Sequence, residues 1–329
     1  MRASVILGVV KASFQSKAQR PLYVWGPPGV GKSNVVVQAG AELGVPVYDL
    51  RPAHYDPTDL RGIPIPKDGK AFWLPPSFLP TVGPGILFFD ELNAAPPAVQ
   101  AACYQLVLDR RVGEYKLPDR VLIVAASNRT SDRAVTHRLS SALANRFVHI
   151  DFEHNIKDWT VWAFGRKLAP QVVAYLNFKP EQLFQFDPQR DDRAFPTPRT
   201  WEYVSDLLAL GLDTDTQSDL IEGTVGKGAS SEFNAFVRLW GDLPDPDEIL
   251  VKGNFIVPPK LDLKYALTIA VIYKSEEATL TNAFKYASAL PPEFGVLLAH
   301  GLALRFGEKL KGNKEFMKWW TKSGAEIII

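Results

Sequence analysis

The sequence predicts an α/β protein with helices on both faces of a parallel sheet, followed by an all-helical region. Runs such as ILFF (86–89) and VLIVAA (121–126) do not alternate with polar residues, which is typical of strands buried on both faces. Segments with helical spacing separate such runs up to residue 152, and beyond it the strand signals fade. We therefore expect a three-layer α/β core at 1–152, a helical domain at 153–255 and a helical extension at 256–329.

The elements of the core can be placed one by one. Residues 1–16 are expected to form an amphipathic helix, and residues 32–43 a helix that stops at Gly44, a residue suited to end a helix. Another helix is expected to open at Pro96 and Pro97, because proline is tolerated in a first turn. The expected strands, in chain order, are 22–26, 45–50, 86–90, 121–127 and 147–152.

Two segments interrupt this alternation. Eight prolines fall within residues 51–85, too many for a helix or a central strand. We expect a long irregular loop there, and such loops inside compact domains are usually functional. Residues 111–116, around Gly113, predict a short hairpin within a segment of about 110–120 that leads into the next strand.

The composition narrows the class of protein. The net charge of +1 over 329 residues gives no overall field toward nucleic acid or an anionic membrane. The single cysteine, Cys103, cannot form an internal disulfide, which fits a reducing cytoplasm. The five histidines show no pairing that predicts structural zinc. The apolar run at 5–10 is too short for a membrane span or a signal-peptide core.

A glycine-rich loop between an apolar strand and a helix predicts nucleoside triphosphate binding. Residues 26–33 fit the pattern G-x-x-x-x-G-K-[ST], in which backbone N–H groups and a helix N-terminus surround phosphates. Lys32 would neutralise the β- and γ-phosphates, and the Ser33 hydroxyl would ligate Mg²⁺. The residues expected to bind ATP are Gly26, Pro27, Pro28, Gly29, Val30, Gly31, Lys32, Ser33 and Asn34.

Polar residues at the ends of two later strands complete the expected site. Asp90 would hold Mg²⁺ together with Ser33, and Glu91 would orient and deprotonate the attacking water. Asn128 follows the strand at 121–127 and would hold the water or the γ-phosphate, although asparagine is also a common residue of turns.

In combination and in order, these motifs resemble those of an AAA+ ATPase, and within that superfamily the MoxR branch. The resemblance covers about 20–250 and leaves the segment after 255 without a motif. It rests on GPPGVGKS, DPTDLRG (56–62), FFDELNAAPPAVQ (88–100), the hairpin before VLIVAASN, ALANRF (142–147) and PTPRTWE (196–202). It implies a P-loop NTPase core, with 153–255 as an α-helical lid.

The resemblance implies roles for further residues. Asn128 matches sensor 1, Arg146 the arginine finger given to a neighbouring subunit, and Arg199 sensor 2 on the lid. A guanidinium can stabilise charge on the transferred phosphoryl group, but either arginine could instead form a surface ion pair. The family implies a homo-hexameric ring with ATP sites between subunits. The segment at 51–85 would be its helix-2 insert and the hairpin at 111–116 its pre-sensor hairpin, both facing the pore.

The sequence allows more than one interpretation of the residues that would contact the substrate and the adenine ring of ATP. Phe72, Trp73 and Lys116 could touch substrate in the pore, or the aromatic rings could pack onto their own domain. The segment 14–20 is the expected site of adenine contacts, without a motif that fixes them.

The chain departs from the branch pattern in two places. Ala94 stands where an arginine is expected after the DELN element, so any contact credited to that arginine is in doubt. The segment between Asn128 and Arg146 lacks the usual Pro-Glu signal and holds Arg129, Arg133 and Arg138. Arg138 could therefore share or replace the finger role of Arg146.

The function implied by the resemblance is an ATP-driven ring that remodels or activates a partner protein. Relatives of this type are chaperone-like and commonly work with a protein that carries a von Willebrand factor A domain, so metal insertion or enzyme activation is an expected role. A nucleic-acid motor is the alternative, against which the near-neutral charge counts. A nucleotide switch with negligible turnover is a third reading, against which Glu91 counts.

The C-terminal segment allows two readings. Residues 305–322 have six basic and two acidic residues beside Phe316, Trp319 and Trp320. A solvated amphipathic helix with its tryptophans inward is favoured over a surface for a partner, a membrane or nucleic acid. The apolar end, Ile327, Ile328 and Ile329, hints at a protein contact.

Overall fold

The computed structural model describes residues 1–132 and 137–323. The chain divides into two compact units, Met1–Asn155 and Ile156–Ile329, and each is described by itself. Arg133 and the isoleucines Ile327, Ile328 and Ile329 lie outside the described residues.

A five-stranded parallel sheet forms the centre of the first unit, in the spatial order β2-β5-β8-β1-β9. The parallel α/β class predicted from the apolar runs is confirmed, and each expected strand is present in its expected place. The strands are β1 (Leu22–Trp25), β2 (Val47–Leu50), β5 (Gly85–Asp90), β8 (Val121–Ser127) and β9 (Val148–Asp151). Because all five run parallel, their carboxyl ends meet at one edge, where ligands bind in open α/β sheets.

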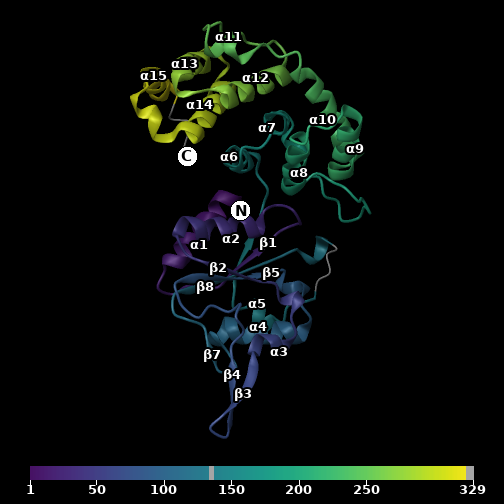
Figure 1. Cartoon of the computed structure of the whole chain (residues 1–329), viewed down its shortest axis with the longest axis vertical. Coiled ribbons are helices and arrows are strands. Elements are labelled where there is room, and N and C mark those ends of the chain that lie inside the picture. Colours follow the sequence, from purple (N-terminus) through teal and green to yellow (C-terminus); the bar gives the residue numbers. More distant parts are fainter. Residues whose placement is uncertain (133–136, 324–329) are drawn as a thin grey trace. The chain divides into compact units, whose positions relative to one another are not determined.

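Helices cover both faces of this sheet, which explains why every residue of β5 and β8 is buried. Helices α1 (Ala3–Gln15) and α2 (Lys32–Leu43) lie on one side, and α4 (Pro97–Asp109) and α5 (Ser141–Ala144) on the other (Figure 1). Alternate strand residues point toward α4 and share one buried cluster with it. These include Tyr23, Leu87, Phe89, Ile123 and Ala125 from the sheet and Val99, Cys103 and Leu106 from the helix.

The N-terminal helix packs beside the helix that follows the glycine-rich loop. Ile6, Val10 and Phe14 recur at four-residue spacing and are buried, so one stripe of α1 faces the core and contacts α2 and β8. This agrees with the amphipathic helix expected for residues 1–16.

The proline-rich segment contains more regular structure than was expected. In place of an irregular loop, residues 51–85 hold a 3-10 turn (Pro52–His54), helix α3 (Pro57–Arg61) and an antiparallel hairpin of β3 (Ile63–Lys67) and β4 (Lys70–Leu74). The turn residues Asp68 and Gly69 both have positive φ, as a two-residue hairpin turn requires.

The register of the hairpin explains how a strand accommodates two prolines. Lys67 pairs with Lys70 across the turn, so Pro64 and Pro66 fall at alternate positions whose N–H groups do not point at the partner strand. The prolines therefore exclude a central strand, as inferred, but allow one edge of an isolated ribbon. The prediction of an irregular loop was wrong because this alternation and the Asp-Gly turn were not recognised.

The second hairpin, β6 (Arg111–Val112) and β7 (Tyr115–Lys116), is bound to the first. The backbone N–H of Trp73 donates to Glu114 Oε2 at 3.2 Å, and the Tyr115 hydroxyl donates to the carbonyl of Pro80 at 2.5 Å. At its base, Arg110 Nη2 donates to the carbonyls of Pro118 and Val121 at 3.0 and 2.9 Å. These bonds hold the two hairpins and the start of β8 together.

The second unit is helical. Its helices are α6 (Ile156–Arg166), α7 (Pro170–Phe178), α8 (Pro198–Leu208), α9 (Thr214–Val225), α10 (Lys227–Trp240), α11 (Pro246–Leu250), α12 (Leu261–Lys274), α13 (Leu280–Ala289), α14 (Pro292–Phe306) and α15 (Lys314–Ser323). One buried cluster contains side chains from both sides of residue 255, among them Trp201 and Phe233 before it and Leu267 and Phe294 after it. The boundary expected near 255 therefore falls inside this unit.

Helix α15 buries only part of its aromatic face. Trp319 is 4% exposed, whereas Trp320 is 37% exposed, and Phe316 packs on Phe284 with the ring centroids 5.2 Å apart. The expectation that both tryptophans point inward holds for Trp319 alone. None of the helices in the described parts of the chain combines the length and the apolarity needed to cross a lipid bilayer.

Candidate active site

The glycine-rich loop connects β1 to α2 at the carboxyl edge of the sheet. Gly29 (φ 75°) and Gly31 (φ 100°) adopt left-handed backbone conformations that other residues adopt only with strain. The loop can therefore turn sharply enough to bring several N–H groups and the N-terminus of α2 toward one point. Gly26 and Val30 are buried in the loop, Pro27 and Pro28 are half-buried, and Asn34 is exposed on α2.

Lys32, the first residue of α2, turns back over the loop. Its Nζ donates at 2.8 Å to the carbonyls of Gly26 and Pro27 and also to Oδ1 of Asn128. The ammonium group thus lies between the loop and the residue that follows β8, separated from it by 96 positions in the chain. This is a location from which a cation can reach a phosphate held by the loop.

Ser33 and Asp90 meet at the same edge. The Ser33 hydroxyl donates to Asp90 Oδ2 at 3.0 Å, and Asp90, the last residue of β5, is 8% exposed. Two oxygen donors at this distance can bind one divalent cation from the same side, and Mg²⁺ takes its remaining ligands from water and phosphate oxygens. No group of three or more histidine, cysteine or carboxylate side chains is placed to hold a metal ion within 1–132 and 137–323. Ser33 and Asp90 fit a metal ion that would take its other ligands from phosphate oxygens and water.

Asp49 of β2 and Arg51, the residue that follows this strand, border this pair. Arg51 Nη2 lies 4.0 Å from Asp90 Oδ2, and its Nε lies 3.9 Å from Asp49 Oδ2. Burial, with the nearby Asp90 carboxylate, raises the pKa of Asp49, and Arg51 partly opposes this effect. Arg51 could not be identified from the sequence. It comes close to the Asp90 carboxylate only because β2 lies next to β5 in the sheet.

Glu91 has an unusual backbone conformation. Its φ of 56° and ψ of 39° are left-handed, which is uncommon for a residue with a Cβ atom and costs free energy. The turn directs the chain from β5 into the 3-10 turn Leu92–Ala94 and leaves the Glu91 side chain exposed beside the buried Asp90. An exposed carboxylate next to a residue that could ligate a metal is placed to act as a base toward water.

A buried hydrogen-bond network connects β1 to the carboxyl ends of β5 and β8. Ser127 Oγ lies 2.8 Å from the Tyr23 hydroxyl and accepts from the backbone N–H of Asn93 at 3.2 Å. The Asn93 side chain, 3% exposed, donates through Nδ2 to the carbonyl of Asn128 at 2.9 Å. Burial raises the pKa of Tyr23, so its hydroxyl stays protonated. The network fixes the backbone of Asn128, whose side chain accepts from Lys32.

Asn93 and Tyr23 were not identified as site residues from the sequence. Asn93 carried a signal, because it stands two residues after Glu91 in DELN and a polar residue there precedes an apolar helix. Tyr23 carried none, because an aromatic residue in a buried strand is ordinary.

The candidate finger arginines differ in their surroundings. Arg129 donates to Asp151 Oδ1 at 3.1 Å, so a surface ion pair accounts for its position. Arg138 and Arg146 are both exposed, and Arg146 directly follows the turn of α5. Within the first unit, Arg146 is not among the residues gathered around Lys32, Ser33 and Asp90.

Arg199 belongs to the second unit. It lies in the first turn of α8, where Thr197 caps the helix by accepting from the N–H of Thr200 at 3.1 Å and Pro198 occupies the first position. The Arg199 side chain is exposed. A cation gains nothing from a helix N-terminus, so its position there has no local electrostatic reason.

A family comparison agrees with this geometry. Residues 21–147 match the family model described as the AAA domain of the dynein-related subfamily. The match begins before β1, includes the glycine-rich loop, Asp90, Glu91 and Asn128, and ends at Phe147. Residues 21–147 are thus similar to AAA domains of this type, and they lie in the first unit, whose fold is a parallel α/β sheet covered by helices.

Solved structures show more distant similarities. NtrX from Brucella abortus in complex with ATP is 14% identical, with 98% of this chain and 68% of that chain covered and a TM-score of 0.44. A putative ATPase from Cytophaga hutchinsonii is 13% identical, with coverage of 90% and 79% and a TM-score of 0.38. A point mutant of RuvB from Thermotoga maritima is 15% identical, with coverage of 98% and 86% and a TM-score of 0.39. A search of curated proteins gave no match.

Proposed function

We propose that this protein is an ATPase that binds Mg-ATP on the glycine-rich loop and hydrolyses it with Glu91 as the base. The observation that carries the proposal is the convergence of Lys32 and Ser33 with residues from two other strand ends. Lys32 Nζ lies 2.8 Å from Asn128 Oδ1, and Ser33 Oγ lies 3.0 Å from Asp90 Oδ2. A cation, two oxygen ligands and a carboxamide around one loop are the groups that phosphoryl transfer needs.

Each residue then has a separate task in hydrolysis. The loop from Gly26 to Gly31 and the start of α2 bind the phosphates, while Ser33 and Asp90 hold Mg²⁺, which supplies charge neutralisation to the phosphate oxygens. Glu91 accepts the proton of the attacking water, and Asn128 orients that water or the γ-phosphate. Lys32 exchanges its contacts with the loop carbonyls for contacts with phosphate oxygens.

The site becomes complete in a ring, proposed to be a homo-hexamer, in which Arg146 reaches the ATP of the next subunit. The exposure of Arg146 at the end of α5 supports this assignment, since a guanidinium without a buried setting is available to another molecule. Arg138 is also exposed and is the alternative finger. Arg199 on α8 acts as the second sensor of the γ-phosphate.

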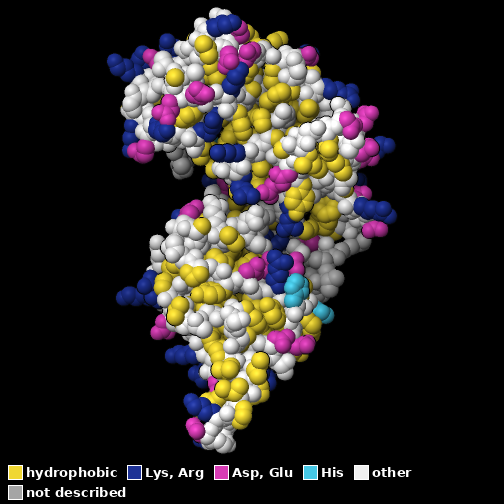
Figure 2. Space-filling view, viewed as in Figure 1, with side chains coloured by type: hydrophobic (Ala, Val, Ile, Leu, Met, Phe, Trp, Pro, Cys, Tyr) yellow, Lys and Arg dark blue, Asp and Glu magenta, His cyan; other side chains and the backbone are white. Residues whose placement is uncertain are grey.

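The ring acts on a partner protein, in the manner of MoxR-type remodelling proteins and with a von Willebrand factor A domain protein as the proposed partner. The β3–β4 hairpin supports a contact with polypeptide, because Ile63, Phe72 and Leu74 are 70%, 40% and 53% exposed. Figure 2 shows hydrophobic side chains gathered along this hairpin at the bottom of the view. Lys67 lies over the Phe72 ring, 5.7 Å from its centroid.

The experiment that tests this function uses Glu91→Gln as a trap. The variant keeps the shape of the side chain and the Mg²⁺ ligands, so it should bind ATP and hold a partner without turnover. The tagged variant is captured from native extract with ATP and Mg²⁺, beside a Lys32→Ala control that cannot hold the nucleotide. A stoichiometric protein absent from the control supports remodelling, whereas nuclease-sensitive nucleic acid would make the protein a nucleic-acid motor.

A further inference from the structure

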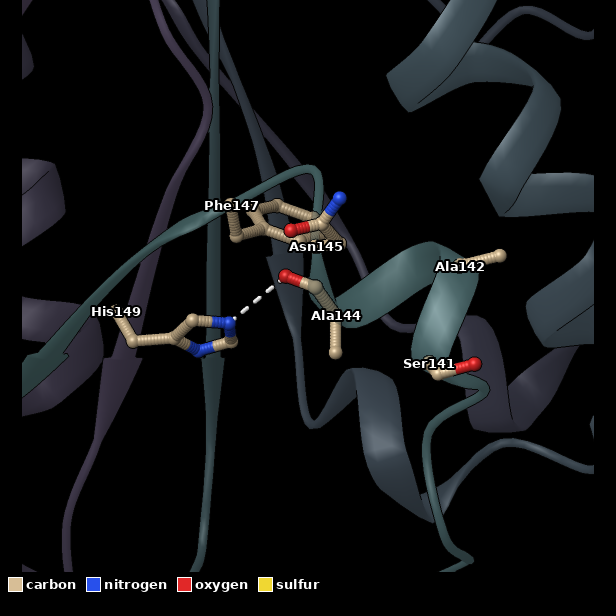
Figure 3. A pocket seen from close by; sticks show the side chains of 6 residues that line it. All are labelled: Ser141, Ala142, Ala144, Asn145, Phe147 and His149. Atoms are coloured by element: carbon tan, nitrogen blue, oxygen red, sulfur yellow. Dashed lines mark hydrogen bonds between the residues drawn. The ribbon is translucent and has the colours of Figure 1, made fainter.

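A chain of two hydrogen bonds connects the strand before the glycine-rich loop to the helix before Arg146. The indole N–H of Trp25, the last residue of β1, donates to Nδ1 of His149 on β9 at 2.8 Å. The other ring nitrogen of His149, Nε2, lies 2.8 Å from the carbonyl oxygen of Ala144, the last residue of α5 (Figure 3). Trp25 directly precedes Gly26, and Ala144 stands two residues before Arg146.

The chemistry of the two partners fixes the proton on the imidazole. An indole N–H can only donate, so Nδ1 of His149 must accept and carry no proton. The Ala144 carbonyl can only accept, so Nε2 must carry the proton and donate it. These two bonds require the Nε2–H tautomer of His149, and neither bond survives in the other tautomer.

Aromatic stacking holds the connection rigid at the β1 side. The rings of Trp25 and Tyr23 lie 4.2 Å apart with an interplanar angle of 8°, and Phe147 meets the Tyr23 ring edge-on at 5.0 Å. His149 stacks on Tyr23 with centroids 5.6 Å apart. Since the Tyr23 hydroxyl contacts Ser127, the same ring also borders the network that holds Asn128.

The α5 side has less support. This helix has only four residues, and the Ala144 carbonyl also accepts from the N–H of Phe147 at 3.2 Å. An open pocket borders the His149 bond and is lined by Ser141, Ala142, Ala144, Asn145, Phe147 and His149 (Figure 3). Open space therefore lies on one side of this bond, while Leu143 and Phe147 anchor the two ends of the turn in the core, so the imidazole is the side-chain partner of the Ala144 carbonyl.

We propose that His149 is a positioning residue that transmits the state of the subunit's own phosphate loop to its finger, Arg146. A shift of the loop at Gly26 moves Trp25, the imidazole follows because both of its nitrogens are engaged, and α5 moves with the Ala144 carbonyl. This inference rests on the proposed function for the assignment of Arg146 to a neighbouring ATP. It adds that, within one subunit, the phosphate loop and Arg146 are mechanically connected through Trp25 and His149.

The test is a double-mutant cycle on Trp25 and His149. Trp25→Phe keeps an aromatic ring on Tyr23 and removes the indole N–H, while His149→Phe keeps a ring beside Tyr23 and removes both ring nitrogens. Each variant should lower kcat about 10-fold, since small misplacements of catalytic groups have effects of that size or more, and leave nucleotide affinity unchanged. The double variant should be no slower than His149→Phe alone, because His149→Phe already lacks the bond that Trp25→Phe removes. Additive losses, or kcat at the wild-type value in Trp25→Phe, would overturn the proposal.

A second readout separates this inference from the proposed function. Arg146→Ala is measured in parallel, and if it turns over ATP normally, the finger assignment fails and not the connection. The connection itself is followed without turnover, by hydrogen exchange of the amides of 144–147 with and without the Mg²⁺ complex of a non-hydrolysable ATP analogue. The analogue should change exchange there in the wild-type protein and not in Trp25→Phe. The same change in both proteins would overturn the connection even if hydrolysis were absent.

Discussion

At the scale of single residues, the backbone of Glu91 is as informative as its carboxylate. A left-handed conformation for a residue other than glycine is retained where the surroundings require it, and such residues concentrate at functional sites. Here the conformation separates the two acids, so that Asp90 points into the sheet edge toward Ser33 while Glu91 is exposed.

This conformation gives a prediction about stability. Glu91→Ala and Glu91→Gly both remove the carboxylate, but only glycine adopts φ near 56° without a Cβ penalty. Glu91→Gly should therefore exceed Glu91→Ala in free energy of unfolding by about 1 kcal/mol, measured by denaturant titration. Equal stability of the two variants would mean that the backbone is not strained there.

At the scale of elements, one tyrosine connects the β6–β7 hairpin to the segment that follows the β3–β4 hairpin. The Tyr115 hydroxyl donates to the Pro80 carbonyl, and burial, together with nearby Tyr48, raises the pKa of Tyr115 to about 12, partly opposed by Arg110. An unfolded tyrosine has a pKa of about 10, so the folded state favours the protonated hydroxyl. The resulting stabilisation is complete below about pH 10 and is lost as the pH rises toward 12.

The corresponding variant is Tyr115→Phe. At pH 9 it should be less stable than the wild-type protein by roughly 1 to 2 kcal/mol, because the hydrogen bond is lost and the Pro80 carbonyl is left without this donor. The difference should shrink as the pH rises to 11, as followed by urea unfolding at each pH. Tyr203→Phe is the matched control, since the Tyr203 ring is 50% exposed and its loss should change stability by less than about 0.5 kcal/mol. A difference that stays constant with pH would contradict the role of Tyr115.

Some elements of the first unit could be predicted from the sequence, and others could not. Unbroken apolar runs such as 86–89 were sufficient to predict the parallel sheet, because burial on both faces leaves no other pattern. The β3–β4 hairpin was missed, because proline content was weighed without the alternation of Pro64 and Pro66 or the turn at 68–69. The residues of the glycine-rich loop and the strand ends carry recognisable motifs.

Contacts between residues that lie far apart in the chain could not be predicted from the sequence. Ser127 joins Tyr23 across 104 positions, and Trp25 joins His149 across 124. Neither pair has a spacing that identifies it, because the sheet order alone brings β1 between β8 and β9. Such residues, including Asn93 and Arg51, can be assigned to the site only when the order of the strands in the sheet is known.

At the scale of the whole molecule, the proposed site combines residues from two copies of the chain. Lys32→Ala should lose nucleotide binding but keep Arg146, and Arg146→Ala should keep nucleotide binding but lose turnover. A mixture of these two inactive variants should hydrolyse ATP, because interfaces form in which one subunit supplies the loop and the other the arginine. Phosphate release from the mixture, compared with each variant alone, is the measurement. A mixture as inactive as its components would place the finger elsewhere, with Arg138→Ala as the next variant for the same mixing experiment.

The central claim is that Glu91 acts as the base for hydrolysis of the ATP that the glycine-rich loop binds. The most direct test measures ATP affinity and steady-state phosphate release on the same preparations of wild-type protein and Glu91→Gln. The account predicts turnover by the wild-type protein, unchanged affinity in the variant, and a fall in turnover of at least about 100-fold, the size of a general-base contribution. Turnover by Glu91→Gln at the wild-type rate would contradict the account.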